Sequence, residues 1–167
     1  MIIRGKALKL GDNINTDFII AGRYKFSITD IKELAKHIME DIDPNFYKKI
    51  EYKKSIIVAG NNFGLGSSRE QAPLVIKEAG IVAVVAKSFA RIFYRNSFNI
   101  GLPLIEMDTS KVEENDLLVI DLEKGRFKDI TKNFESEIPP LPLFMCNFIK
   151  ENGLINYIKK YKDLKIC

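Results

Sequence analysis

Two kinds of hydrophobic pattern alternate along the first two thirds of the chain. Alternating or continuous apolar runs rich in Ile and Val predict strands, at residues 2–10, 55–59 and 81–86. Segments with apolar residues at every third or fourth position predict helices, at residues 31–41, between the serines 67–68 and Gly80, and at residues 89–96. Residues of the kind that cap helices precede each of them: Asp30, Ser67 or Ser68, and Ser88. Because strands and helices alternate, we expect a parallel arrangement of the strands.

The last third of the chain has a different pattern. Residues 117–122 and 126–130 flank the turn sequence Glu-Lys-Gly and predict an antiparallel hairpin. A proline-rich break at 139–142 precedes two expected helices, at residues 143–151 and 154–161. The whole pattern predicts an α/β fold with a mixed sheet.

The segment with the most chemical content is GNNFGLGSSREQA, residues 60–72, which joins a predicted strand to a predicted helix. Gly64 and Gly66 permit backbone conformations that other residues avoid, and unpaired amides at a helix start favour a bound anion. Arg69 adds a planar guanidinium that can hold a carboxylate through two hydrogen bonds. The alternative is a tight strand-to-helix turn without a ligand. The string is not a P-loop, since no Lys-Ser or Lys-Thr follows the glycines.

Together with KSFARIFYRN at residues 87–96 and Asn15-Thr16-Asp17 near the start, this string resembles the signature of the aconitase superfamily's swivelling domain. In particular, the chain resembles the separate small subunits of isopropylmalate dehydratase and homoaconitase. The resemblance covers essentially the whole chain and implies a single domain over residues 1–167 with a three-layer β/β/α arrangement. It also implies a hydro-lyase that isomerises a 2-substituted malate by dehydration and rehydration, as in leucine and branched-chain amino-acid biosynthesis.

The resemblance assigns roles to individual residues. Ser67, the first serine of Gly-Ser-Ser-Arg-Glu, is implied to be the base that abstracts a proton, and Arg69 to hold a substrate carboxylate. Ser68, Thr16 and Asp17 are implied to lie at the substrate, although relatives have an acid at the position of Asn15. For Thr16 and Asp17, an ordinary loop turn is the alternative.

Residues 22–27 correspond to the loop that reads the substrate's distinguishing group in relatives. Its candidate residues are Arg23, Tyr24, Lys25, Phe26 and Ser27. Homoaconitase-type loops carry an arginine at the position of Phe26, so an apolar residue there favours isopropylmalate or citramalate over a tricarboxylate. The loop is one residue longer than usual, which leaves open that Arg23 or Lys25 reaches the substrate.

Composition limits which cofactors and partners the chain can have. Its two cysteines, Cys146 and Cys167, are too few for the 4Fe-4S cluster of aconitase-like chemistry. We therefore expect no metal on this chain and a cluster-bearing large subunit as its partner, in a heterodimer or heterotetramer. The only histidine, His37, has no companion ligands in the sequence, and we expect a surface or supporting role for it.

The remaining bulk properties predict a protein of the cytoplasm. The sequence is 46% hydrophobic and 29% charged, and it contains no long apolar run or signal-peptide pattern. The net charge of +4 includes lysines of the last predicted helix, which we interpret as a solvated face and not as a nucleic-acid site. Two other functions stay open from the sequence: a homoaconitase-type small subunit, and a non-catalytic module that binds anions.

Overall fold

Seven strands form one mixed sheet in the order β4-β3-β2-β1-β5-β6-β7. The computed structural model describes residues 1–24 and 27–162 of the chain. The strands are β1 (Ile2–Lys9), β2 (Ser55–Val58), β3 (Ile81–Ala86), β4 (Leu104–Glu106), β5 (Leu117–Asp121), β6 (Arg126–Asp129) and β7 (Phe134–Glu137). β1 to β4 pair in parallel, whereas β1 with β5, β5 with β6 and β6 with β7 pair antiparallel. The predicted α/β class and mixed sheet are confirmed.

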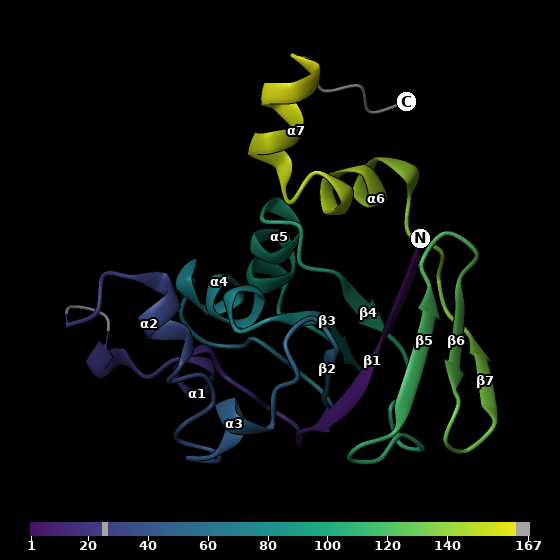
Figure 1. Cartoon of the computed structure of the whole chain (residues 1–167), viewed down its shortest axis with the longest axis horizontal. Helices are drawn as coiled ribbons and strands as arrows, with labels where there is room; N and C mark the ends of the chain where they lie inside the picture. Colours follow the sequence, from purple (N-terminus) through teal and green to yellow (C-terminus); the bar gives the residue numbers. More distant parts are fainter. Residues whose placement is uncertain (25–26, 163–167) are drawn as a thin grey trace.

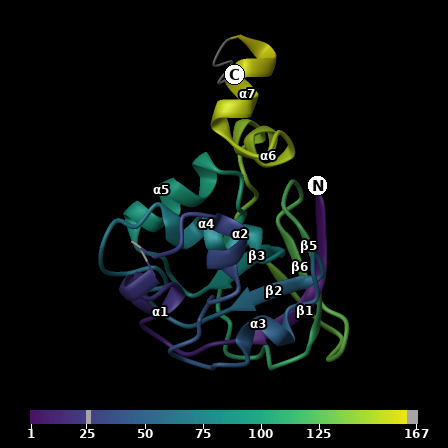
Figure 2. The same ribbon diagram turned by 60° about the vertical axis from the view of Figure 1, so that its left-hand side comes forward.

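Short helices connect the parallel strands. They are α1 (Thr16–Ile19), α2 (Ile31–Ala35), α3 (Phe46–Lys49), α4 (Gln71–Glu78) and α5 (Arg91–Asn99), with a 3-10 turn, η1, at Gly22–Tyr24. These five helices lie on one side of the molecule and β5 to β7 on the other (Figure 1). The chain ends in α6 (Leu143–Lys150) and α7 (Leu154–Tyr161), which extend beyond α5 at one end (Figure 2).

Both faces of the central strands are buried, because successive side chains point to opposite faces of a sheet. On β2, Ile57 belongs to the core under the helices, while Ile56 and Val58 belong to the core that faces the antiparallel strands. In the second core they meet Leu118 of β5 and Phe127 of β6. The curled sheet therefore supplies two β layers and the helices a third, which is the predicted β/β/α arrangement.

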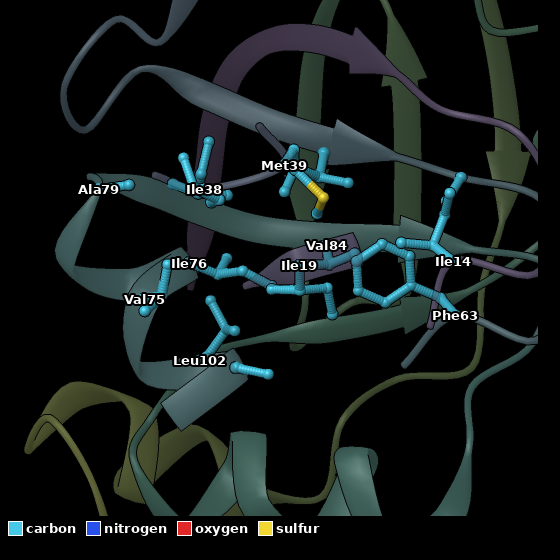
Figure 3. Close-up of a cluster of buried hydrophobic side chains, with 14 of the residues drawn as sticks. Ile14, Ile19, Ile38, Met39, Phe63, Val75, Ile76, Ala79, Val84 and Leu102 are labelled. Carbon is cyan, nitrogen blue, oxygen red and sulfur yellow. The ribbon is translucent and has the colours of Figure 1, made fainter. Parts of the chain in front are cut away.

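The core under the helices also anchors the loop that carries the glycines and serines. Figure 3 shows Phe63 of this loop and Ile19 of α1 in one cluster with Ile76 of α4 and Val84 of β3. Each of these four side chains is fully buried. The loop is thus fixed to the sheet at Phe63, directly before the residues that form the candidate site.

Two of the expected helix starts are wrong. α4 begins at Gln71 after Glu70 and has no side-chain cap, so neither Ser67 nor Ser68 caps it. The chain forms a further turn first, in which Arg69 N–H donates to Ser67 O at 2.7 Å. Ser88 likewise does not cap α5, because the N-cap position is Ala90, two residues further on. The Ser88 hydroxyl accepts instead from Asn62 N–H at 2.9 Å.

The other differences concern weak local signals. Asp30 caps α2 as expected, with its carboxylate accepting from Lys32 N–H, but the helix ends at Ala35 and continues as turns. β7 was not expected, because its Phe-Glu-Ser-Glu sequence is polar and only its pairing with β6 makes it a strand.

No helix within residues 1–24 and 27–162 has the length and apolar character needed to cross a membrane.

Candidate functional site

The candidate site begins where two loops lie side by side. The loop after β1 runs along the loop after β2, with isolated parallel bridge pairing at Asn15 and Leu65. Four backbone hydrogen bonds join the loops, from Gly60 to Gly11, Asn13 to Asn61, Gly64 to Ile14 and Thr16 to Leu65, at 2.7–3.0 Å. The sequence elements around Thr16 and Ser67, far apart along the chain, are brought together in this way.

Thr16 fixes the backbone at Ser67. Its hydroxyl donates to Ser67 O at 3.0 Å, and its side chain is buried. Asn15 caps α1 by accepting from Phe18 N–H at 2.8 Å, so Asn15-Thr16-Asp17 forms the start of a short helix. Ser67 and Ser68 themselves are exposed. The serine backbone is therefore held while the side chains remain accessible.

Gly64 and Gly66 adopt the left-handed conformation, with φ of 79° and 98°, as the sequence predicted. A Cβ on Gly64 would lie 2.2 Å from Cγ of Phe93, which is a collision. At Gly66 the nearest atom to such a Cβ is Thr16 Oγ1 at 3.5 Å. Gly64 is thus required both for its backbone conformation and for the close approach of α5.

Arg69 has two partners from the α1 region. Its Nη1 donates to Ile20 O at 2.9 Å, and its Nη2 forms an ion pair with Asp17 Oδ1 at 2.5 Å. The Arg69 side chain is 19% exposed and that of Asp17 is 54% exposed. Gly22 lies against the guanidinium, since a Cβ there would stand 3.2 Å from Nη2. An arginine has five N–H donors, so three remain for a ligand.

Thr16, the glycine–serine loop and Arg69 line one pocket of about 320 Å³. Its walls come from Thr16, from the loop residues 64 and 66–69, and from α5 and the residue before it. The α5 side consists of Ala90, Arg91, Ile92, Phe93 and Asn96. Six of the predicted site residues therefore share a pocket: Thr16, Gly64, Gly66, Ser67, Ser68 and Arg69. Asp17 does not line it but pairs with Arg69, which does.

The α5 wall is the part of the site that sequence reasoning underestimated. Arg91 and Asn96 were not among the predicted site residues, yet both line the pocket. Amides in the first turn of a helix lack intrahelical acceptors, and they give that end a positive potential. The helix start that lines the pocket beside the serines is thus that of α5, whereas Glu70 and Gln71 at the start of α4 do not line it. The signal available was Ala90-Arg91, directly before the apolar spacing of the helix.

In the loop expected to read the substrate, Arg23, Tyr24 and Ser27 do not line the pocket. Arg23 forms two hydrogen bonds to Asp41, at 2.7 and 2.9 Å, and this raises the pKa of Arg23 and lowers that of Asp41. Tyr24 OH donates to Glu40 at 2.8 Å. Ser27 is exposed and its hydroxyl lies 3.3 Å from Arg23 O.

Lys25 and Phe26 lie outside the described residues, so the prediction that Phe26 is the apolar reader stays a prediction.

The described part of the chain does not fit an iron–sulfur cluster. Cys146 of α6 is fully buried against the core that faces the antiparallel strands, and burial raises the pKa of its thiol. No group of three or more His, Cys, Asp or Glu side chains within residues 1–24 and 27–162 could hold a metal ion. A cluster normally requires three or four cysteine thiolates, which this chain lacks.

The mixed sheet and the pocket built on a Gly-Ser-Ser-Arg loop define the class of aconitase-type swivelling domains. Residues 3–110 match the family described as the aconitase C-terminal domain. Relatives extend the similarity over nearly the whole chain. The 3-isopropylmalate dehydratase small subunit 2 of Archaeoglobus fulgidus is 51% identical, covering 97% of this chain and 98% of that protein. The small subunit 1 of Thermotoga maritima is also 51% identical, over 96% of each chain.

A solved structure agrees with the sequence relatives. The crystal structure of 3-isopropylmalate dehydratase (leuD) from Methanocaldococcus jannaschii superposes with a TM-score of 0.91 at 48% identity. The superposition covers 97% of this chain and 96% of that one. The chain belongs to the aconitase C-terminal domain family, in its group of 3-isopropylmalate dehydratase small subunits.

Proposed function

We propose that this chain is the small subunit of a hydro-lyase that isomerises 2-isopropylmalate to 3-isopropylmalate by dehydration and rehydration, in leucine biosynthesis. The observation that carries the proposal is the near-full-length similarity to 3-isopropylmalate dehydratase small subunits, at about 51% identity. The shared pocket of Thr16, Ser67 and Arg69 supports it, because this pocket contains groups suited to a carboxylate substrate. A homoaconitase-type function is not favoured by these relatives.

In this proposal Ser67 takes the proton α to a substrate carboxylate. A serine hydroxyl is a weak base unless the alkoxide is stabilised. The α5 helix start and the charges of Arg69 and Arg91 supply positive potential at the pocket that Ser67 lines. The hydrogen bond from Thr16 to Ser67 O holds the serine backbone while its side chain acts.

Arg69 is the proposed carboxylate clamp. Its contact with Ile20 O and its ion pair with Asp17 orient the guanidinium, and its remaining N–H groups are available to the substrate. Asp17 acts in this scheme by orienting Arg69, because a carboxylate in contact with the substrate carboxylate would repel it. Ser68 and the left-handed turn at Gly64 and Gly66 complete the wall that receives the substrate.

The proposal includes a large subunit that carries the 4Fe-4S cluster, since the described residues of this chain offer no ligand set for one. The pocket is open and formed by one chain, and a partner closing over it would exclude water and strengthen its electrostatic interactions. Phe26 and the loop around it are proposed to select an apolar substituent, isopropyl or methyl.

Anaerobic reconstitution with candidate cluster-bearing large subunits tests the function. Activity is assayed on isopropylmalate, citramalate and homocitrate, and we expect turnover of isopropylmalate. Preference for homocitrate would overturn the substrate assignment. A chain that binds anions but never engages such a subunit would support the non-catalytic module instead.

Ser67→Ala tests the base in the same reconstituted complex. We expect kcat to fall by at least about 100-fold with little change in KM, because the proton acceptor is lost while Arg69 remains. Ser136→Ala on the distant strand β7 is the matched control and should leave kcat unchanged. Near-normal turnover of Ser67→Ala would remove Ser67 from the mechanism.

A further inference from the structure

One oxygen of Glu40 contacts two side chains, Tyr24 of the loop at residues 22–27 and His37 of the turns that follow α2. Tyr24 OH donates to Glu40 Oε2 at 2.8 Å, and His37 Nδ1 lies 2.7 Å from the same oxygen. The rings of Tyr24 and His37 are stacked, with centroids 4.1 Å apart and planes 25° apart. The hydrogen bonds from Tyr24 and then His37 lower the pKa of Glu40. Glu40 is therefore an ionised acceptor, which assigns the proton to Nδ1 of His37.

This group of three side chains is connected to Arg69 by short steps along the chain. Tyr24 closes the 3-10 turn that begins at Gly22, and Gly22 lies against the Arg69 guanidinium. The turn that carries Glu40 is also bonded to the end of α1, because Met39 N–H donates to Ile19 O at 3.0 Å. The next residue, Ile20, is the one whose carbonyl accepts from Arg69. The turn that carries Glu40 thus supports both backbone segments that contact the guanidinium.

The neighbouring ion pair of Arg23 and Asp41 is a second support for the same loop. Its two parallel hydrogen bonds give it a fixed geometry, and water and salt screen it because its side chains are 51% and 38% exposed. Arg23 also lies over the Tyr24 ring, 4.8 Å from its centroid, so it covers the aromatic stack on the outside.

We propose that Glu40 and His37 are positioning residues that hold Tyr24, and through the Gly22–Tyr24 turn keep Arg69 in its carboxylate-binding geometry. The inference rests on the proposed function of Arg69. The two residues do not touch the pocket, so they act on substrate binding and not on proton transfer.

The kinetic test is Glu40→Ala in the reconstituted complex. We expect KM for isopropylmalate to rise about tenfold while kcat stays within about twofold, because a small displacement of a clamp weakens binding. Glu40→Gln should restore much of the loss, since an amide oxygen can still accept from Tyr24. Tyr24→Phe removes only the hydroxyl, keeps the stacked ring, and should raise KM even if Glu40→Ala does not fold.

The matched control is Glu33→Ala. Glu33 is an exposed acid of α2 whose side-chain partner is Lys36, and its loss should leave KM unchanged. Equal KM values for Glu40→Ala and Glu33→Ala would overturn the proposal. A fall in kcat with unchanged KM would also overturn it, because that pattern belongs to the chemical step.

A measurement on the isolated chain separates this inference from the proposed function. Limited trypsin digestion reports how often the loop opens, and we expect cleavage after Arg23 to be several-fold faster in Glu40→Ala than in wild type or Glu33→Ala. Unchanged cleavage would refute the anchoring role. If the wild-type complex never isomerises isopropylmalate while cleavage still accelerates, the proposed function fails and the anchoring of Tyr24 stands.

Discussion

At the scale of the residue, the contacts of the Arg69 side chain do most to define the geometry of the site. Its guanidinium contacts Asp17, Ile20 and the bare backbone of Gly22, so three separate positions are adjusted to one planar group. A lysine ammonium is a point charge and cannot reproduce such a planar set of contacts. The geometry of this arginine, more than its charge, distinguishes the pocket from an ordinary basic surface.

Arg69→Lys should therefore weaken substrate binding more than catalysis. We expect KM to rise about 10- to 100-fold, corresponding to roughly 1.5–3 kcal/mol for a lost hydrogen bond to a charged group. Steady-state kinetics of the reconstituted complex measure it. Arg126→Lys, on the distant strand β6, should leave KM unchanged. A KM for Arg69→Lys equal to that of wild type would show that Arg69 does not hold the carboxylate.

Single residues were predictable where one steric rule decides the conformation. Gly64 and Gly66 were expected to adopt conformations closed to other residues, and both have positive φ. Ser67 and Ser68 were wrongly expected to cap a helix, because a serine before an apolar segment satisfies the capping pattern whether or not an extra turn intervenes. Tertiary contacts at Arg69 decide that turn, and they are not encoded in local spacing.

At the scale of the element, the β5–β6 hairpin contains a buried acid with an unusual environment. Asp129 is fully buried, its Oδ1 accepts from Lys132 N–H at 3.1 Å, and its Oδ2 has no hydrogen-bond partner in the described chain. Burial and the neighbouring Asp116 raise the pKa of Asp129. Burial also acts on Asp116, but the hydrogen bond from Glu113 N–H, the neighbouring carboxyl of Asp129 and the ion pair with Lys132 lower its pKa. The pair favours one proton between two carboxylates.

Asp129→Asn should stabilise the protein at neutral and alkaline pH. Because the folded state raises this pKa, the destabilisation from Asp129 is absent below its unfolded pKa of about 4 and grows as pH rises through the folded pKa. The Asn amide can donate to Asp116 at every pH, so we expect a gain of about 1 kcal/mol at pH 8 and almost none at pH 4. Urea denaturation at several pH values measures the difference.

The control for this hairpin is Glu135→Gln on β7. Glu135 is an exposed acid paired with Lys128, and this ion pair lowers its pKa, so its removal should give no gain at pH 8. If the free energy of unfolding changed with pH in the same way for Asp129→Asn and for wild type, the raised pKa of Asp129 would be contradicted.

Elements were predictable in proportion to their own hydrophobic pattern. The hairpin of β5 and β6 followed from two apolar runs around a glycine turn, and the structure has it. β7 has a polar sequence and exists through its pairing with β6, which no local pattern reveals. The role of α5 in the pocket was underestimated for a similar reason, since its apolar face indicated packing and its helix start faces the serines only after folding.

At the scale of the whole molecule, the proposed function makes this pocket one wall of a site that the large subunit completes. The pocket opens beside α5, whose Ile92 is 53% exposed and lines it. A second hollow of about 480 Å³ adjoins it at Arg91 and is lined also by Tyr94 and Arg95. Ile92 is an exposed apolar side chain that stands between Arg91 and Arg95 in the sequence of α5. We expect it to contact the large subunit that the proposed function requires.

Ile92→Asp should weaken association with the large subunit at least about tenfold, because it would bury a charge in the contact between the two subunits. Titration of the large subunit, followed by activity or by calorimetry, measures the change. Ile130→Asp is the matched control, since Ile130 is 47% exposed and lies beside β1 and β5, far from the pocket. Equal affinity of the two variants would exclude α5 from the interface.

The α/β class and the mixture of parallel and antiparallel strands were predictable, because strand and helix patterns alternate and then give way to a hairpin. The pocket as a whole was not, since it depends on two loops joined over a distance in sequence and on α5 approaching Gly64. The resemblance of residues 60–72 to the aconitase family implied that Thr16, Ser67 and Arg69 lie together, and no local sequence pattern implied this.

The ion pair of Asp17 with Arg69 has a consequence for how the empty site behaves. The Asp17 carboxylate already pairs with Nη2 of Arg69, so the guanidinium is held in place and is not available to pair with another acidic side chain. In the proposed reaction the substrate carboxylate binds the N–H groups that Asp17 leaves, and Asp17 stays in place. Asp17 offsets much of the positive charge of Arg69, so the long-range attraction between this arginine and a substrate anion is weak. Affinity for the substrate should therefore depend only shallowly on ionic strength.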